Sequence, residues 1–278
     1  MTPVSPEIVL VLGAGGARGL GQIVVLETLD AMGIRPARIV GCSIGAALGA
    51  AYAAGLPGAE LRAHVLSSFR DRARTIARLL EARIGRIAHL RQFGNPALID
   101  GERLLDLFWP EDVPDRFEEL ALPFAALAAD FHRQSPVLIE RGPLTPAVAG
   151  SLAIPGLVRP VQLGGHVLVD GATIDPLPYE AEVRAGRLVI AVDTGPAAPT
   201  GAEHLPGALE AIVGASQILT RGLVRRMLLV SQPDILIRLG GDGIGVLDFF
   251  KAGHILAAAA PAGEELRRAL SPALSQPL

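Results

Sequence analysis

Gly41-Cys42-Ser43-Ile44-Gly45 is the stretch that decides the fold. A short apolar run, 39–40, precedes it, and a run of small helix-forming residues, 46–54, follows it. A serine between two glycines where a strand gives way to a helix has the sequence form of a nucleophile elbow, because glycine leaves room for the strand and helix to approach closely. The serine hydroxyl then lies at the positive end of the helix dipole. We therefore predict that Ser43 is the nucleophile of an α/β enzyme.

A glycine-rich turn lies upstream of this stretch, at Gly13-Ala14-Gly15-Gly16-Ala17-Arg18-Gly19. It follows the apolar run 8–12 and precedes a helical pattern of apolar residues over 20–32. Backbone N–H groups at the start of a helix have no intrahelical partner and bind anions. In an acyl-transfer enzyme the anion is the oxyanion of the tetrahedral intermediate. The turn therefore predicts an oxyanion hole.

An acidic residue, Asp170, ends the short strand-like run 166–169 and is followed at once by glycine. Catalytic groups of α/β enzymes gather at the ends of strands, which favours this acid. Other acids compete with it. Asp130 and Asp193 also follow strand-like runs, and Asp175 precedes a proline, which is typical of a turn.

Histidine and cysteine provide rival assignments. A conventional α/β-hydrolase has its histidine after the acid, a position that His204 and His254 hold in the sequence. The first lies in a Pro/Gly-rich stretch and the second in an alanine-rich helical pattern, which are ordinary settings for a structural histidine. Cys42 is the single cysteine, which excludes an intramolecular disulfide and a cysteine-based metal site. We expect its side chain to point away from the site.

The glycine turn also permits a dinucleotide-binding interpretation. That fold requires an acid about 20 residues beyond the glycines, at the end of the second strand. The segment 35–41 contains no acid. Arg38 would suit a site for a phosphorylated dinucleotide, but the strand runs directly into the serine turn. The sequence therefore disfavours a nucleotide cofactor.

Composition and periodicity predict the fold class. The chain has 278 residues and a formal net charge of −3, which gives no global attraction to nucleic acid. Strand-like and helical runs alternate, which predicts an α/β fold with a mostly parallel central sheet and helices on both faces. No linker-like segment divides the chain, so we expect one domain over 1–278 with a core of about 8–270. The expected strands are 8–12, 38–40, 124–129, 137–140, 166–169, 188–192 and 235–238, and the expected helices are 20–32, 44–54, 59–69, 74–90, 101–108, 206–229 and 248–270.

These motifs together resemble the patatin-like phospholipase family, in particular its short bacterial members. The likeness extends to the segments 151–156, 170–178 and 251–253. It implies a patatin-like variant of the α/β-hydrolase architecture and a Ser-Asp dyad in place of a triad. Ser43 would be the nucleophile and Asp170 its only side-chain partner. The resemblance implies no metal and no organic cofactor.

The glycine turn carries the remaining site residues that the resemblance implies. Gly15 and Gly16 would supply amides to the oxyanion hole, and Arg18 would contact the loop or a phosphate. The amide of Ile44, directly after the nucleophile, is a further candidate. Ala14 stands where the family usually has glycine, which we expect to be tolerated if its φ is negative.

The function expected from these residues is that of a serine acyl hydrolase. It would cleave lipid esters as a phospholipase A-type enzyme or lysophospholipase, through an acyl-enzyme intermediate. A carboxylesterase, thioesterase or acyltransferase with the same dyad remains an alternative, as does a catalytically silent regulatory binding protein. The sequence does not determine the oligomeric state.

A basic segment and the N-terminus bear on location. The segment 70–91 begins with Arg70, ends with Arg91 and carries seven arginines against Asp71 and Glu81, with apolar residues at helical spacing. It is either a peripheral contact with a lipid surface or a helix that packs on the domain with a solvated basic face. Residues 1–7 lack the basic region of a signal peptide. We therefore expect a cytoplasmic enzyme and leave open a peripheral contact with the inner membrane surface.

Overall fold

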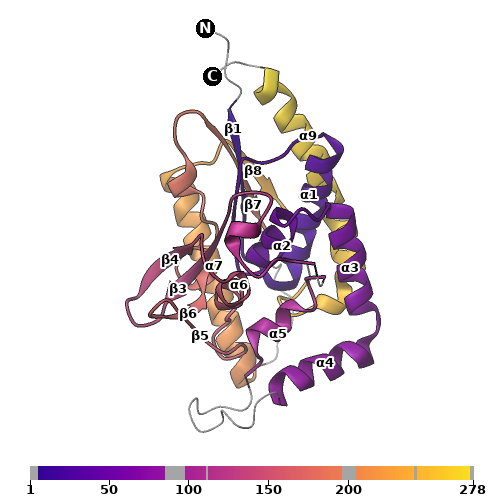
Figure 1. Ribbon diagram of the computed structural model, residues 1–278, viewed down its shortest axis with the longest axis vertical. Coiled ribbons are helices and arrows are strands. Elements are labelled where there is room, and N and C mark those ends of the chain that lie inside the picture. Colours follow the sequence, from indigo (N-terminus) through magenta and orange to yellow (C-terminus); the bar gives the residue numbers. More distant parts are fainter. Residues whose placement is uncertain (1–5, 85–97, 111, 196–204, 241–242, 276–278) are drawn as a thin grey trace.

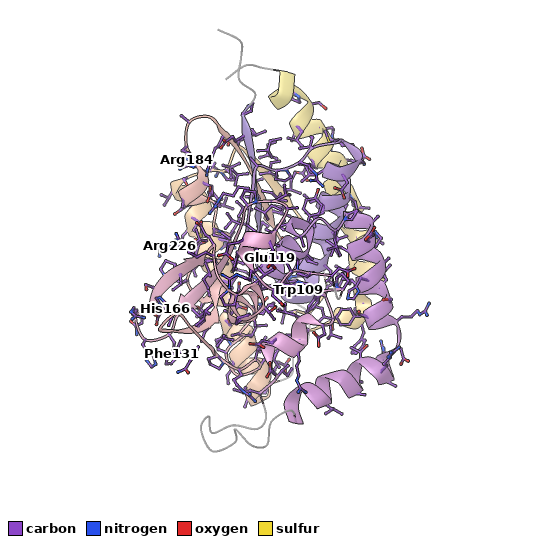
Figure 2. The ribbon with its side chains drawn as sticks, viewed as in Figure 1. Trp109, Glu119, Phe131, His166, Arg184 and Arg226 are labelled. Carbon is purple, nitrogen blue, oxygen red and sulfur yellow. The ribbon has the colours of Figure 1, made fainter. Side chains whose placement is uncertain are left out.

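The computed structural model describes residues 6–84, 98–110, 112–195, 205–240 and 243–275 of the chain. Its centre is an eight-stranded sheet in the order β5-β6-β3-β2-β1-β7-β8, with β4 paired on β3. The five strands from β3 to β8 in this order are parallel, and β4, β5 and β6 form an antiparallel end. Figure 2 labels Phe131 and His166 at this antiparallel end.

The described strands are β1 (Glu7–Leu12), β2 (Arg38–Cys42), β3 (Phe124–Asp130), β4 (Ser135–Ile139), β5 (Val161–Leu163), β6 (His166–Asp170), β7 (Arg187–Asp193) and β8 (Ile235–Arg238). The described α-helices are α1 (Gln22–Ala31), α2 (Ile44–Ala53), α3 (Gly58–Arg70), α4 (Arg72–Ile84), α5 (Gly101–Leu105), α6 (Leu144–Ser151), α7 (Ala208–Val230), α8 (Ala252–Ala258) and α9 (Ala260–Ser275).

Helices cover both faces of the sheet, as Figure 1 shows. Side chains alternate between the faces along each strand. Leu10 and Leu12 of β1 belong to a large core shared with α1, α2, α3 and α9, whereas Val9 and Val11 belong to a smaller core on which α7 packs. This arrangement confirms the predicted α/β fold class with a mostly parallel sheet.

The edge of β3 explains how distant residues of the chain meet. Residues 126–130 of β3 pair with β4 on one edge. On the other edge Leu127 lies opposite Cys42 of β2, and the next residue, Ala128, lies opposite Asp170 of β6. Because β2 is parallel and β6 antiparallel to β3, the two strands run toward each other and their C-terminal ends meet. The elbow and the acid are thereby brought together.

All seven expected strands are present, but the sequence did not predict one further strand and one further α-helix. The strand β5 has only three residues, and α6 contains proline and small residues without a helical period. Pro146 is tolerated because it lies in the first turn of the helix, where its missing N–H is not needed. The expected helix 248–270 is in fact a 3₁₀ turn, η6 (Phe249–Lys251), followed by α8 and α9.

The basic segment 70–91 is divided between two helices. The first helix, α3, ends at Arg70, Asp71 is extended, and α4 starts at Arg72. Residues 85–97 lie outside the described residues, so the predicted continuation of the helix to residue 90 stays untested. No helix in the described parts of the chain has the length and apolarity to cross a lipid bilayer.

Candidate active site

Ser43 lies at the sharp turn between β2 and α2. Its backbone has φ 55° and ψ −124°, and Ser43 and Gln134 are the two non-glycine residues with positive φ in the described part of the chain. Such a conformation costs on the order of 1–3 kcal/mol and persists where the surroundings hold it. Gly45 is required here because a Cβ at this position would lie 2.2 Å from the carbonyl oxygen of Leu12. The close packing of α2 on β1 thus gives the elbow its shape.

The hydroxyl of Ser43 donates a hydrogen bond to Oδ2 of Asp170 at 2.7 Å. Both side chains are buried, at 3% and 4% exposure. The other carboxylate oxygen, Oδ1, accepts from the amide of Ala172 at 2.8 Å. Burial raises the pKa of Asp170 to about 6, while the bonds from Ala172 and Ser43 oppose the shift. Asp170 is therefore ionised at neutral pH, yet it is a stronger base than an ordinary carboxylate.

Ser151, at the end of α6, supports the elbow from behind. Its Oγ accepts from the backbone N–H of Ser43 at 2.8 Å and donates to the carbonyl oxygen of Leu127 at 2.6 Å. The side chain is completely buried. This connection joins the strained residue to the strand next to it. Sequence reasoning included Ser151 in a family-like segment but missed its contact with Ser43, because no local pattern relates residues so far apart.

The glycine turn follows β1 and faces the same region. Gly16 has φ +55°, and its position is so close to Val246 that a Cβ would lie 2.3 Å from that residue's carbonyl oxygen. The hydroxyl of Thr194 donates to the carbonyl oxygen of Ala14 at 2.8 Å and fixes the turn. The amides of Gly15 and Gly16 have no hydrogen-bond partner among the described residues. Ala14 does not have a positive φ, so its methyl group is accommodated.

A cavity of about 380 Å³ brings these groups together. Its lining includes Gly15, Gly16, Arg18, Ser43 and Asp170, all of them predicted site residues. The sixth predicted residue, Ile44, is not in the lining. Its side chain instead packs against Gly19, where an added Cβ would lie only 2.1 Å from Cγ2 of Ile44.

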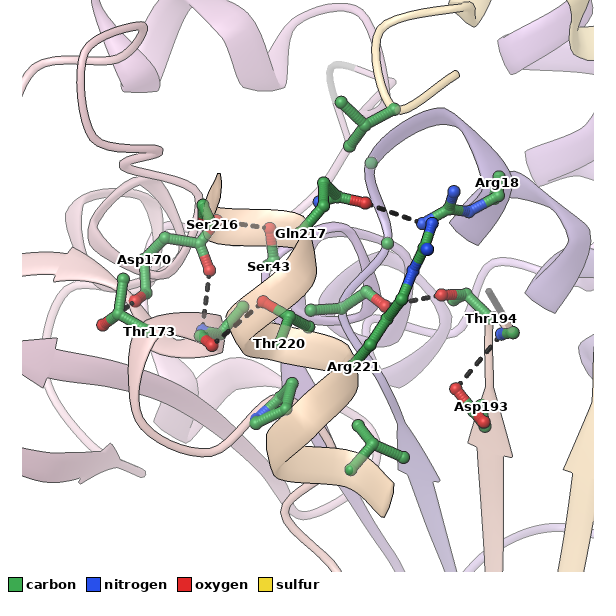
Figure 3. A pocket seen from close by; sticks show the side chains of 18 of the residues that line it. Arg18, Ser43, Asp170, Thr173, Asp193, Thr194, Ser216, Gln217, Thr220 and Arg221 are labelled. Carbon is green, nitrogen blue, oxygen red and sulfur yellow. Dashed lines mark hydrogen bonds between the residues drawn. The ribbon is translucent and has the colours of Figure 1, made fainter. Parts of the chain in front are cut away.

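Arg18 supplies positive charge to the cavity. Its Nη2 donates to Oε1 of Gln217 at 2.8 Å, whereas its buried Nε and Nη1 have no partner among the described residues. Burial lowers the pKa of Arg18, and Arg221 lowers it further, against the opposite effect of Asp193. Figure 3 shows the side chains of Arg18 and Arg221 extending toward each other across the cavity from Asp170. Two neighbouring guanidinium groups with free N–H groups are suited to an anion. Sequence reasoning missed Arg221.

The rival acids have other surroundings. Asp130 accepts hydrogen bonds from the amides of His132 and Arg133 and forms an ion pair with the Arg133 side chain, which fixes the turn after β3. Asp193 lines the cavity, but its carboxylate accepts from the amide of Gly195. Asp175 is not in the lining of the cavity. Of the four acids, Asp170 is the one in contact with Ser43.

The rival nucleophile and bases are also separated from the cavity. Cys42 is fully buried, does not line the cavity, and has its thiol pKa raised well above the ordinary value by burial. His254 lies exposed on α8 and is not in the lining. His204 lies outside the described residues, so its assignment stays untested.

Comparison with known proteins bears directly on this geometry. A family model described as patatin-like phospholipase matches residues 10–183, which include the glycine turn, the elbow and Asp170. The chain belongs to the patatin-like phospholipase family. Members of this family are lipid acyl hydrolases that act on ester bonds.

The chain is also similar to individual proteins. The chain is 38% identical over 174 residues to an uncharacterized NTE family protein of Mycobacterium bovis, across 63% of this chain and 45% of that protein. It is 31% identical over 195 residues to patatin-like phospholipase domain-containing protein 7 of Rattus norvegicus, across 68% of this chain and 14% of that protein. The chain thus spans less than half the length of these relatives. VipD from Legionella pneumophila is similar in structure with a TM-score of 0.49 and 14% identity, across 94% of this chain and 67% of VipD.

Proposed function

We propose that the chain hydrolyses phospholipid or lysophospholipid esters through a Ser43-Asp170 dyad. The observation that carries the proposal is the 2.7 Å contact between the Ser43 hydroxyl and the Asp170 carboxylate in the wall of the cavity that holds the glycine turn. A nucleophile, its base and free amides are the three elements that acyl transfer requires. Ser43, Asp170 and the glycine turn all follow strands of the same sheet, which supports a single catalytic domain.

The first half of the reaction forms an acyl-enzyme. Oγ of Ser43 attacks the ester carbonyl carbon as its proton passes to Oδ2 of Asp170, and the amides of Gly15 and Gly16 bind the oxyanion. The amide of Ser43 itself is occupied by Ser151, so it takes no part in the oxyanion hole. When the tetrahedral intermediate collapses, the C–O bond of the ester breaks and the leaving alcohol takes the proton from Asp170.

The second half returns the enzyme to its starting state. Water attacks the acyl carbon and gives a proton to Asp170, the intermediate collapses to the free fatty acid, and Oγ of Ser43 recovers the proton. Asp170 is suited to both directions because its pKa of about 6 lies near the operating pH. A phosphate beside the ester would accept hydrogen bonds from the free N–H groups of Arg18 and Arg221.

The proposal is tested by active-site labelling together with a substrate panel. A fluorophosphonate probe should label the wild-type protein and fail to label Ser43→Ala, with both proteins equally folded by circular dichroism. Phospholipids, lysophospholipids, acyl-CoA and short p-nitrophenyl esters, compared by kcat/KM, separate a lipid hydrolase from a thioesterase or general esterase. A folded wild-type protein that neither takes the label nor hydrolyses any ester of the panel would refute the proposal in favour of a silent binding protein.

A further inference from the structure

The outward face of α7 carries large apolar side chains in its first half and at its C-terminal end. Five large apolar side chains on this helix are exposed: Ile212 at 50%, Ile218 at 70%, Leu219 at 68%, Leu229 at 82% and Val230 at 84%. They recur with the spacing of a single helix face, and the exposed small residues Ala211, Ala215 and Gly222 lie between them. We call these five large residues the α7 stripe. The stripe has two parts, 212–219 and 229–230, with the exposed Arg226 between them, and exposed apolar clusters of this kind are typical of an interaction site.

The opposite face of α7 carries four polar side chains as well as the apolar Val213, Val224 and Leu228, which also line the cavity. Ser216, Gln217, Thr220 and Arg221 line the cavity that contains Ser43. Figure 3 shows these four side chains on the helix beside Ser43 and Asp170. A surface helix of a globular protein ordinarily has polar residues on its exposed face, so the large apolar residues on the outside of α7 are unusual. Leu229 of the stripe also belongs to the cavity lining, so the C-terminal end of the stripe borders the cavity, whereas the part of the stripe over 212–219 lies on the other side of the helix from it.

Charge indicates which occupant covers the stripe. The helix α7 carries three arginines, Arg221, Arg225 and Arg226, against a single acid in its first turn, Glu210. Arg225 and Arg226 are both exposed; Arg225 belongs to the cavity lining, and Arg226 lies on the outward face between Leu219 and Leu229, at the outer edge of the molecule in Figure 2. Anionic lipid headgroups complement such a face, whereas a second copy of the same face would bring further cations to it.

We propose that the α7 stripe inserts into the surface of an anionic lipid bilayer and that the first half of α7 separates the lipid from the catalytic cavity. Choosing lipid as the occupant rests in part on the proposed function, because a lipid ester has to leave the bilayer to reach Ser43. The contact differs from the basic segment 70–91, whose described part, Arg70, Asp71 and α4, is not in the lining of the cavity.

The test uses vesicle sedimentation with protein carrying Ser43→Ala, so that the vesicles stay intact. The stripe variant combines Ile212→Gln, Ile218→Gln and Leu219→Gln, three positions outside the cavity lining. We expect its binding to vesicles of phosphatidylcholine mixed with phosphatidylserine to fall at least about a hundredfold, since removing one such side chain from an apolar phase costs on the order of tenfold. With Ser43 intact, its hydrolysis of a soluble short ester should match that of wild type.

Two further variants sharpen the test. The control Ile76→Gln with Leu80→Gln changes two half-exposed apolar residues of α4, at 46% and 48%, and should bind vesicles as the parent protein does. Arg226→Gln should weaken binding about fivefold to the mixed vesicles and leave binding to pure phosphatidylcholine unchanged.

Each contrary outcome is distinct. Unchanged sedimentation of the stripe variant overturns the proposal, as does an equal loss in the α4 control. A wild-type dimer that the stripe variant dissociates, with vesicle binding unaffected, would assign the stripe to a second copy of the chain. Absence of soluble-ester hydrolysis in wild type would refute the proposed function and leave the sedimentation result interpretable.

Discussion

Replacing Asp170 by Asn should abolish activity and stabilise the folded protein. The carboxylate is buried at 4% exposure, and its pKa is raised from 3.8 to about 6. A raised pKa in an acid means that the folded state holds the proton more tightly than the unfolded state does. Wild-type stability therefore falls as pH rises from about 4 through about 6, and the full penalty is present above that range.

The size of the effect follows from the shift in pKa. Two pH units correspond to about 3 kcal/mol, at about 1.4 kcal/mol per unit, which sets an upper value because the two hydrogen bonds to the carboxylate also change. Asn keeps an oxygen that can accept from the amide of Ala172 but carries no negative charge. Asp170→Asn should thus gain up to about 3 kcal/mol of unfolding free energy over wild type at pH 8 and little at pH 4.

The same pKa fixes the activity profile. In the proposed mechanism the ionised carboxylate is the base, so kcat/KM of wild type for a soluble ester should fall about fivefold between pH 6 and pH 5. Asp175→Asn is the matched control, because burial also raises the pKa of Asp175 to about 6 although its side chain is outside the cavity lining. The control should keep both the turnover and the inflection.

Urea denaturation at several pH values and initial rates on a p-nitrophenyl ester provide the two measurements. An Asp170→Asn protein that is no more stable than wild type at pH 8 would contradict the assigned cost of burying the carboxylate. A wild-type profile flat from pH 5 to 8 would contradict its role as base. Loss of the inflection in Asp175→Asn would show that the pH dependence of activity comes from Asp175 and not from Asp170.

Three further perturbations test the surroundings of the dyad. Ser151→Ala leaves the buried N–H of Ser43 without its hydrogen-bond acceptor. The unfolding free energy should therefore fall by about 2 kcal/mol and kcat about tenfold, with KM nearly constant. An unchanged kcat would show that Ser151 does not position Ser43. Gly16→Ala should lower kcat at least about a hundredfold, because a Cβ would displace the turn from Val246, and near-normal turnover would remove its amide from the oxyanion hole. His254→Ala should keep most activity in the same ester assay, since the residue is exposed on α8; a folded but inactive variant would replace the dyad with a triad.

The local sequence predicted the strands and turns that carry the site residues, but not the contact between Ser43 and Asp170. The apolar runs of β1, β2 and β7 are short and continuous, which is typical of buried parallel strands, and the elbow and glycine turn follow two of them. The contact between Ser43 and Asp170 depends on β2 and β6 ending against each other along β3. That register is a property of strand pairing over 127 residues of separation, and no local pattern encodes it.

The hydrogen bond between Ser151 and the backbone of Ser43 was not predicted, for a related reason. The short helix α6 has few large apolar residues and a proline in its first turn, so its sequence lacks a helical period. Tertiary packing, with Leu144, Ala147 and Val148 buried against the core, determines that it is helical. Ser151 at its end then reaches the backbone of Ser43, a role that its residue type alone does not indicate.

Sequence periodicity predicted the helix α7 but not its orientation on the sheet. The pattern over 206–229 correctly predicted a helix, but periodicity gives the width of an apolar face and not the direction in which it points. One turn near the end of the helix, with Val224, Met227 and Leu228, packs on the sheet beside Val9 and Val11. This contact fixes the rotation of the whole helix, and the rotation directs its polar residues to the cavity and the α7 stripe outward. The rotation that places Arg221 near Arg18 therefore also leaves apolar residues of α7 exposed. Insertion into the proposed lipid surface would remove these residues from water.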